Sequence, residues 1–271
     1  MTVIGTNVAA MRASYASTTA QNSLSKAIDR LSTGKRINSA ADDAAGNAIA
    51  TRMTSQIRGL NQAVRNANDG ISLAQTAEGG MNEIVNMLQR MRELSVQSAS
   101  GTLQDTDRVN LQAEVAELIL QIDDVASRTD FNGVALLDGT NATVDVQTGS
   151  SSGETVAITL TDVTAATLAV DAIDIGTAAG GDGALTVLDT ALDTITTAQA
   201  TLGAAQNRLQ ATVSSLVNRV TNLSESRSRI QDANFSEEST QLAKAQILSQ
   251  ASTAMLAQAN QSQQGVLSLI R

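Results

Sequence analysis

Apolar residues recur every three or four positions along most of this chain, a spacing that places them on one face of an α-helix. The longest such pattern covers residues 184–231, where Leu, Ile and Val continue in these steps for about six heptads. Gln199, Gln206 and Arg227 interrupt it. The segment predicts a coiled coil or a long bundle helix, and polar residues in such a seam often fix its register at a cost in stability.

Residues 44–99 predict a second, very long helix. Apolar residues alternate in steps of four and three up to Ala74, and the pattern resumes with a shifted phase at Met81, after Gly79 and Gly80. We expect the glycine pair to let the helix bend.

Residues 105–129 predict a third helix, which has apolar residues on two faces. A helix of this kind is expected to be sandwiched inside a bundle, because both faces need a partner. One face carries Leu111, Val115, Leu118, Ile122 and Val125, and the other carries Val109, Ala113, Ala116 and Leu120.

The chain ends, residues 3–31 and 236–271, predict helices with thin apolar stripes, because Ser, Thr, Asn, Gln and Ala occupy the other faces. Such a stripe buries little by itself, so we expect these ends to be mobile in the monomer and helical only when assembled. This terminal stripe comprises Ile4, Val8, Met11, Leu24, Ile28 and Leu31, together with Leu242, Leu248, Met255, Val266 and Ile270.

Glycine concentrates in residues 130–183, where the runs 143–147 and 155–163 alternate apolar and polar residues. The alternation predicts a β-hairpin, which we expect to be exposed. Together the patterns predict a mainly α protein: a long antiparallel helical bundle or coiled coil with a small β-hairpin region.

Residues 35–46 join the first two predicted helices and contain Asp42 and Asp43. An acidic pair at a helix start suits capping and the helix dipole. It can also belong to a metal or acid–base site, but the sequence shows no third ligand, so capping is the favoured interpretation.

The composition excludes several kinds of chemistry. The chain has no His and no Cys, which rules out Cys/His zinc sites, Ser-His-Asp or Cys-His nucleophiles and thiol redox chemistry. Its formal net charge of −9 argues against nucleic-acid binding, and it has no apolar run long enough to be inserted in a membrane. We expect no cofactor and no enzymatic activity.

Long motifs in both parts of the chain resemble those of bacterial flagellins. The resemblance covers residues 1–140 and 184–271, and the middle carries no comparable match. The motifs are LSTGKRINSAADDAAGNAIATRMTSQIRGLNQAVRNANDGISLAQTAEGGMNEI (31–84), LQRMRELSVQSASG (88–101), TDFNGVALLDG (129–139), LGAAQNRLQATVSSL (202–216), SRIQDANFSEEST (228–240) and MLAQANQSQQGVLSLIR (255–271).

The resemblance implies a structural subunit that polymerises through its terminal helices into the helical flagellar filament for swimming motility. It implies a terminal coiled-coil inner domain (1–34 plus 236–271), a spoke linker (35–46) and a rod-shaped helical domain (47–235) with the β-hairpin region at about 130–183. The spoke contains Lys35, Arg36, Asp42 and Asp43.

The same resemblance implies partners and a location. The partners are further copies of the chain, flagellar cap and hook-junction proteins, and a cytoplasmic export chaperone at residues 230–271. The location is the extracellular flagellum, and the resemblance implies export by the type III route. The N-terminus has no pattern of a cleaved signal peptide, so we expect export without one.

The resemblance also marks a ridge that packs between protofilaments and that a vertebrate Toll-like receptor reads in flagellins of many motile bacteria. From the residues alone, the same face could be an ordinary solvated helix surface, with Leu94 in a subunit contact. The matching residues are Gln89, Arg90, Arg92, Glu93, Leu94 and Gln97, with Glu114 on the next helix.

Three alternatives remain open at this point. A hook–filament junction protein of the same superfamily shares the terminal helices, but more often has proline near the acidic pair, where this chain reads SAADDAAG. A flagellin with an inserted enzyme would need more than the short, His- and Cys-free middle segment. A free coiled-coil adaptor would fit the heptads but would not need motifs at both ends.

Overall fold

The computed structural model describes residues 6–268, and the side chains of residues 6–265. The described residues form five helices and two small antiparallel hairpins, which confirms the predicted mainly α fold. The elements are α1 (Val8–Thr33), α2 (Ala44–Ala99), α3 (Asp105–Arg128), β1 (Asp130–Phe131), β2 (Val134–Ala135), β3 (Thr143–Gln147), β4 (Thr155–Thr159), α4 (Ala178–Gln231) and α5 (Phe235–Ser268).

The chain divides into two compact units. The terminal unit comprises the chain up to Ile57 and from Thr221 onward, and the rod unit comprises Arg58–Val220. None of the described helices is sufficiently long and apolar to pass through a bilayer.

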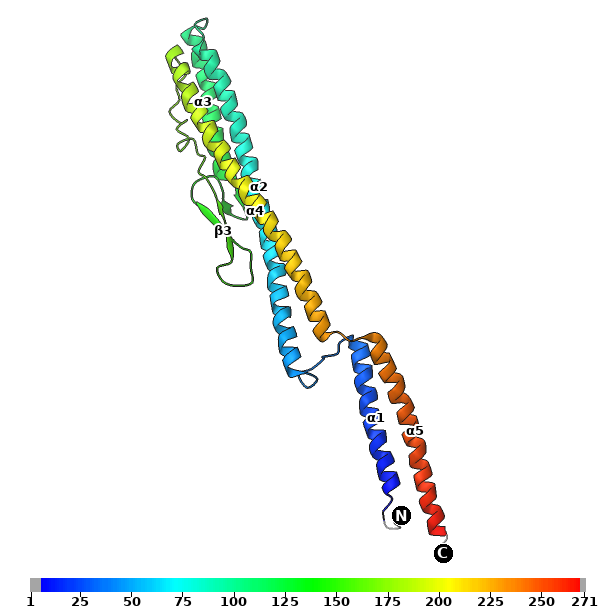
Figure 1. Ribbon diagram of the computed structural model, residues 1–271. Helices are drawn as coiled ribbons and strands as arrows, with labels where there is room; N and C mark the ends of the chain where they lie inside the picture. Colours follow the sequence, from blue (N-terminus) through cyan, green and yellow to red (C-terminus); the bar gives the residue numbers. More distant parts are fainter. Residues whose placement is uncertain (1–5, 269–271) are drawn as a thin grey trace. The chain divides into compact units, whose positions relative to one another are not determined.

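In the terminal unit, α1 and α5 lie side by side and run antiparallel (Figure 1). At one end Asn7 Nδ2 donates to the carbonyl of Ala259 at 3.1 Å, and at the other end Arg30 Nη1 donates to Glu238 Oε1 at 2.9 Å. Asn7 also caps α1 by accepting from the amide of Ala10, and Gly34 ends the helix in the left-handed conformation that glycine tolerates.

Small residues form the seam between α1 and α5. Ala13, Ala20 and Ala27 are buried at intervals of seven on α1, opposite buried Ala245 and Ser252 on α5. Seven-residue intervals keep one line of residues facing the partner helix. Because alanine and serine are short, the helices approach closely but bury little apolar surface.

In the rod unit, α2, α3 and α4 pack around one aliphatic core, and α4 runs antiparallel to α2 (Figure 1). The heptad residues of α2 and α4 supply much of this core, as the periodicity predicts. The most deeply buried side chains include Met81, Ile84, Leu88, Met91, Leu94, Ile122, Leu188 and Ile195.

Each polar interruption of the α4 heptads meets a polar side chain of α2. Gln199 Nε2 donates to Asn82 Oδ1 at 2.9 Å, and Gln206 Nε2 donates to Glu78 Oε2 at 2.9 Å. In the terminal unit, Arg227 Nη1 lies 3.4 Å from Thr54 Oγ1. A shift of α4 along α2 would break these pairs, which agrees with a role in setting the register.

Gly80 allows close packing against α2, a role that the expectation of a bend at Gly79 and Gly80 did not include. A Cβ at Gly80 would lie 2.7 Å from Leu137 Cδ1 and 2.8 Å from Thr129 Oγ1. The missing side chain therefore lets the chain that follows α3 lie directly against α2.

The segment after α3 is only partly exposed, contrary to expectation. β3 and β4 pair in the predicted hairpin, with Val146 opposite Val156, and both of these side chains are buried. β4 is shorter than the predicted run, and residues 178–183 belong to α4 rather than to the β region. The irregular chain 164–177 adds buried side chains to the core, namely Ala165, Leu168, Val170, Ile173 and Ile175.

The prediction that α3 is sandwiched inside the bundle is wrong for the protomer. Its first apolar face packs into the core, where Val115 and Ile122 are fully buried. The second face is exposed, with Val109 and Leu120 each 62% accessible. The segment 164–177 covers only the edge beside this face, where Gln112 and Asp123 bind its backbone.

Candidate assembly surfaces

The terminal stripe does not lie on one face of the α1–α5 pair. Leu24, Leu31 and Leu242 are half-buried next to the alanine seam, whereas Val8 and Met11 are exposed on the opposite face of α1. Ile28, Leu248 and Met255 are also exposed. Ile4 and Ile270 lie outside the described residues, as does the side chain of Val266.

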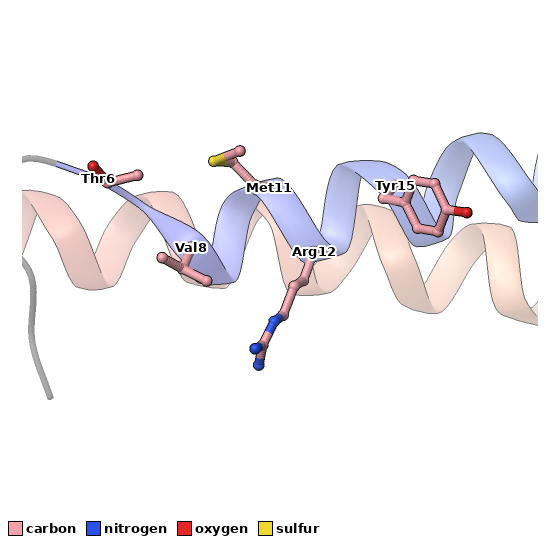
Figure 2. A pocket seen from close by; sticks show the side chains of 5 residues that line it. All are labelled: Thr6, Val8, Met11, Arg12 and Tyr15. Atoms are coloured by element: carbon pink, nitrogen blue, oxygen red, sulfur yellow. The ribbon is translucent and has the colours of Figure 1, made fainter.

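Because the stripe is divided between two faces, α1 carries an exposed apolar patch on the face turned away from α5. Val8, Met11 and Tyr15 follow one another at helical spacing, and Tyr15 is 77% exposed. They line an open hollow with Thr6 and Arg12, and Figure 2 shows Thr6 just before α1 and the other four side chains on its first turns, with α5 behind. Sequence reasoning missed Tyr15 and Arg12 as site residues, although the spacing from Val8 and Met11 places Tyr15 on the same face.

A second hollow lies between α1 and α5. Its wall includes the Arg30–Glu238 ion pair, and Lys26 and Lys244 stand at its edge. The Glu238 side chain is largely buried, so Arg30 supplies the charge that allows a carboxylate in the seam.

Backbone hydrogen bonds hold the spoke against the end of α4. The amides of Arg36 and Ile37 both donate to the carbonyl of Gln231, at 2.7 and 3.3 Å, and Lys35 forms a bridge with Asp232. The Arg36 guanidinium also donates to the carbonyl of Ile230 at 2.7 Å. Lys35 and Arg36 therefore join the N-terminal segment of the terminal unit to its C-terminal segment.

The two spoke carboxylates have separate structural tasks. Asp43 is the cap of α2, since its Oδ1 accepts from the amide of Gly46 at 2.9 Å. Asp42 accepts from the amides of Asn38 and Ser39, and its other oxygen lies 3.3 Å from Lys26 Nζ. No group of metal-ligating side chains occurs among the residues that the structure describes.

These contacts favour the charged form of Asp42. The amides of Asn38 and Ser39, and then Lys26, lower the pKa of Asp42 from 3.8 to about 2. A lowered native pKa stabilises the fold above the unfolded value, and the contribution disappears as the pH falls from about 4 toward 2.

We therefore expect Asp42→Asn to lower the melting temperature of the chain at neutral pH, and the difference from wild type to shrink below about pH 4. Thermal unfolding followed by circular dichroism across this range measures the difference. In Lys26→Met, which lacks one of the partners, the contribution of Asp42 should be smaller and its loss should be complete at a higher pH. A difference that stays constant down to pH 2 would show that the Asp42 charge does not contribute.

The predicted ridge joins all three helices of the rod unit. Arg90 of α2 donates from Nε to Glu114 Oε1 of α3 at 2.8 Å and from Nη1 to Glu93 Oε2 at 3.0 Å. Arg92 donates to Asp189 Oδ1 of α4 at 2.7 Å. Glu114 and Glu93 raise the pKa of Arg90, and Asp189 raises the pKa of Arg92.

Exposed pairs of this kind add little to stability but orient the side chains. Gln89 and Gln97 remain exposed beside them and are available to a partner. Leu94 differs, because it is 1% exposed and belongs to the core. The surface of the ridge therefore consists of the other six predicted residues.

Comparisons with known families match both ends of the chain. The family model described as "Bacterial flagellin N-terminal helical region" matches residues 4–142, and the one described as "Bacterial flagellin C-terminal helical region" matches residues 185–270.

Individual relatives agree with these matches. A flagellin of Halalkalibacterium halodurans is 44% identical over 271 residues, which cover 99% of this chain and 100% of that protein. A flagellin of Salmonella muenchen is 50% identical over 173 residues, which cover 64% of this chain but only 34% of the longer relative.

Solved structures give the same result for the fold. The crystal structure of Bacillus cereus flagellin matches with a TM-score of 0.52 and 31% identity, covering 60% of this chain and 94% of that one. A putative flagellar hook-associated protein from Vibrio parahaemolyticus matches with a TM-score of 0.60 at 16% identity, covering 70% of this chain and 100% of that one, and so shares the fold alone.

Proposed function

The chain belongs to the bacterial flagellin family and is a structural subunit of the extracellular flagellar filament, not an enzyme, and from this premise we propose which of its surfaces build the polymer. The observation that carries the assignment is the pair of family matches at the two ends. The same two ends contain α1 and α5, which pair with each other.

The terminal helices are the inner assembly domain of this proposal. Residues 1–34 and 236–271 form it, residues 35–46 are the spoke, and residues 47–235 are the rod with its β region at about 130–183. The outer face of α1 supports this role, because the described residues leave the apolar side chains of Val8, Met11 and Tyr15 exposed, where a neighbouring subunit would bury them.

The ridge is the proposed contact between protofilaments, and it is also the surface proposed for a vertebrate Toll-like receptor. Its fixed arginines and its exposed glutamines suit a partner that recognises charge and hydrogen bonds. The six exposed ridge residues are Gln89, Arg90, Arg92, Glu93, Gln97 and Glu114.

Further partners follow from the position of the chain in a flagellum. We expect contacts with flagellar cap and hook-junction proteins, and export through the type III route without a cleaved signal peptide. Residues 230–271 are the proposed segment for a cytoplasmic chaperone, since Ile247, Leu248 and Met255 expose apolar side chains on α5. The same side chains can serve the chaperone first and the filament afterwards.

Seeded polymerisation tests the function directly. Purified chain added to short filament seeds at neutral pH should produce long filaments that electron microscopy and sedimentation both detect. A hook–filament junction protein should form at most short assemblies on its own, so a failure to elongate would favour that alternative.

A further inference from the structure

Two methionines of the terminal unit have exposed side chains. Met11 of α1 is 64% exposed and Met255 of α5 is 63% exposed. Figure 2 shows the Met11 side chain, with its sulfur, extending away from the α1 ribbon. In the rod unit, by contrast, Met81 and Met91 are fully buried in the aliphatic core. A reagent in solution can therefore reach the thioethers of the two terminal helices and not those of the core.

The two exposed methionines lie at the same level of the α1–α5 pair. Asn7 Nδ2 of α1's cap contacts the carbonyl oxygen of Ala259 on α5 at 3.1 Å. The helices run antiparallel and each rises about 1.5 Å per residue, so four residues forward on α1 and four back on α5 lead from this contact to Met11 and Met255. A change of polarity at the two sulfurs therefore falls on one turn of the pair.

The composition makes these thioethers the main target for an oxidant. The chain has no Cys and no Trp, the other two side chains that oxidants attack most readily. Methionine fills that gap, and the accessibility of each sulfur decides how fast it reacts. Oxidation of the folded chain is therefore expected to begin on the terminal helices.

The reaction is the transfer of one oxygen atom from a hydroperoxide to the thioether. A lone pair of the sulfur attacks a peroxide oxygen, the S–O bond forms and the O–O bond breaks. The sulfur loses two electrons and the peroxide gains them, so hydrogen peroxide leaves as water. The product is a sulfoxide, which is polar and chiral where the original side chain was apolar and flexible.

We propose that Met11 and Met255 are oxidation sites through which hydroperoxides stop unassembled subunits from polymerising. The inference rests on the proposed function, because it takes the outer faces of α1 and α5 as surfaces that neighbouring subunits bury. Burial of a sulfoxide there is unfavourable, since its oxygen gives up hydrogen bonds to water. The protomer keeps its fold, because neither sulfur belongs to the buried alanine seam. Methionine sulfoxide reductases reverse the modification, which makes it a switch.

Peptide mass spectrometry after treatment with hydrogen peroxide tests which sulfurs react. In the monomer, Met11 and Met255 should be oxidised about tenfold or more faster than Met81 and Met91, because core packing excludes the reagent. In sedimented filaments the first two should react about tenfold more slowly than in the monomer, because neighbouring subunits cover them. Equal rates for the exposed and the buried pair, or equal rates in monomers and filaments, would overturn the inference.

Seeded elongation tests the consequence of the modification. Peroxide should slow the elongation of wild-type chain about fivefold or more, and the two reductases that act on the two sulfoxide epimers should restore it. Met11→Leu combined with Met255→Leu removes both sulfurs and keeps apolar side chains of similar volume, so this variant should elongate equally well before and after peroxide. Met53→Leu combined with Met87→Leu is the matched control; these side chains are half-buried on α2, and the variant should respond to peroxide as wild type does.

The possible failures separate the inference from the function on which it rests. If wild-type chain oxidised at positions 11 and 255 elongated at the untreated rate, the inference would be wrong and the proposed function would stand. An equal loss in wild type and in the variant without the two sulfurs would assign the damage to other residues and would also overturn it. A loss of helicity on oxidation, measured by circular dichroism, would show unfolding in place of a block to assembly. Failure of untreated wild-type chain to elongate would overturn the proposed function, and the inference with it.

Discussion

Filaments should not grow from a chain that ends at Gln241. Deletion of residues 242–271 removes most of α5 and with it the partner of α1. The alanine seam of α1 then faces water, and a single helix of this length with so little apolar surface is marginal in water. The rod unit, whose core lies entirely within Arg58–Val220, should keep its fold.

Seeded growth, scored by electron microscopy and sedimentation, measures the first effect, and thermal unfolding followed by circular dichroism measures the second. A full-length variant with Leu248→Gln and Met255→Gln is the matched control. It keeps the α1–α5 seam but loses the exposed apolar side chains, so it should retain its helicity and polymerise more weakly. Elongation by the truncated chain as fast as by the full-length chain would contradict assembly through the terminal helices.

The long helices α2 and α4 could be predicted from the sequence because their apolar residues recur with a single helical period. In α2 and α4 most heptad positions are occupied by Leu, Ile, Met and Val. The structure buries part of these side chains and leaves others, such as Leu192 and Val213, half-buried against the core. The polar interruptions were also informative, since Gln199 and Gln206 each find a polar partner on α2. A long helix with a strong apolar period leaves few alternatives for its packing.

The terminal stripe was harder to predict, because the size of a side chain, more than its hydrophobicity, determines which residues lie between α1 and α5. Large apolar residues were taken as the buried line, yet the structure buries Ala13, Ala20 and Ala27 and leaves Met11 exposed. Alanine allows a closer approach of two helices than methionine, and a hydrophobicity pattern does not register this. The expectation that the ends become ordered only on assembly stays a prediction, and the weak seam is its physical basis.

Residues 164–177 and helix α3 show a second limit of prediction from the sequence. Leu168, Val170 and Ile173 are buried from a stretch without helix or strand, so no period could identify them. The two faces of α3 were recognised correctly as apolar, but the pattern could not tell whether the same chain or another covers the second face. Sequence periodicity reports that a face needs a partner and does not identify the partner.

Replacing either of two leucines by alanine should give two variants that differ strongly in the free energy of unfolding. Leu88 of α2 is fully buried in the rod core, and Leu120 of α3 is 62% exposed. Leu88→Ala should cost about 2–5 kcal/mol, because it removes buried surface and leaves a cavity, and should lower the melting temperature by roughly 5–15 °C. Leu120→Ala should change the stability of the monomer by no more than about 0.5 kcal/mol.

Urea unfolding of the monomers, followed by circular dichroism, gives both free energies of unfolding. Filaments of Leu88→Ala should still elongate at low temperature, because the substitution leaves the surface of the subunit unchanged. If Leu120→Ala destabilised the monomer as much as Leu88→Ala does, the side chain of Leu120 would belong to the core of the protomer and not to its surface.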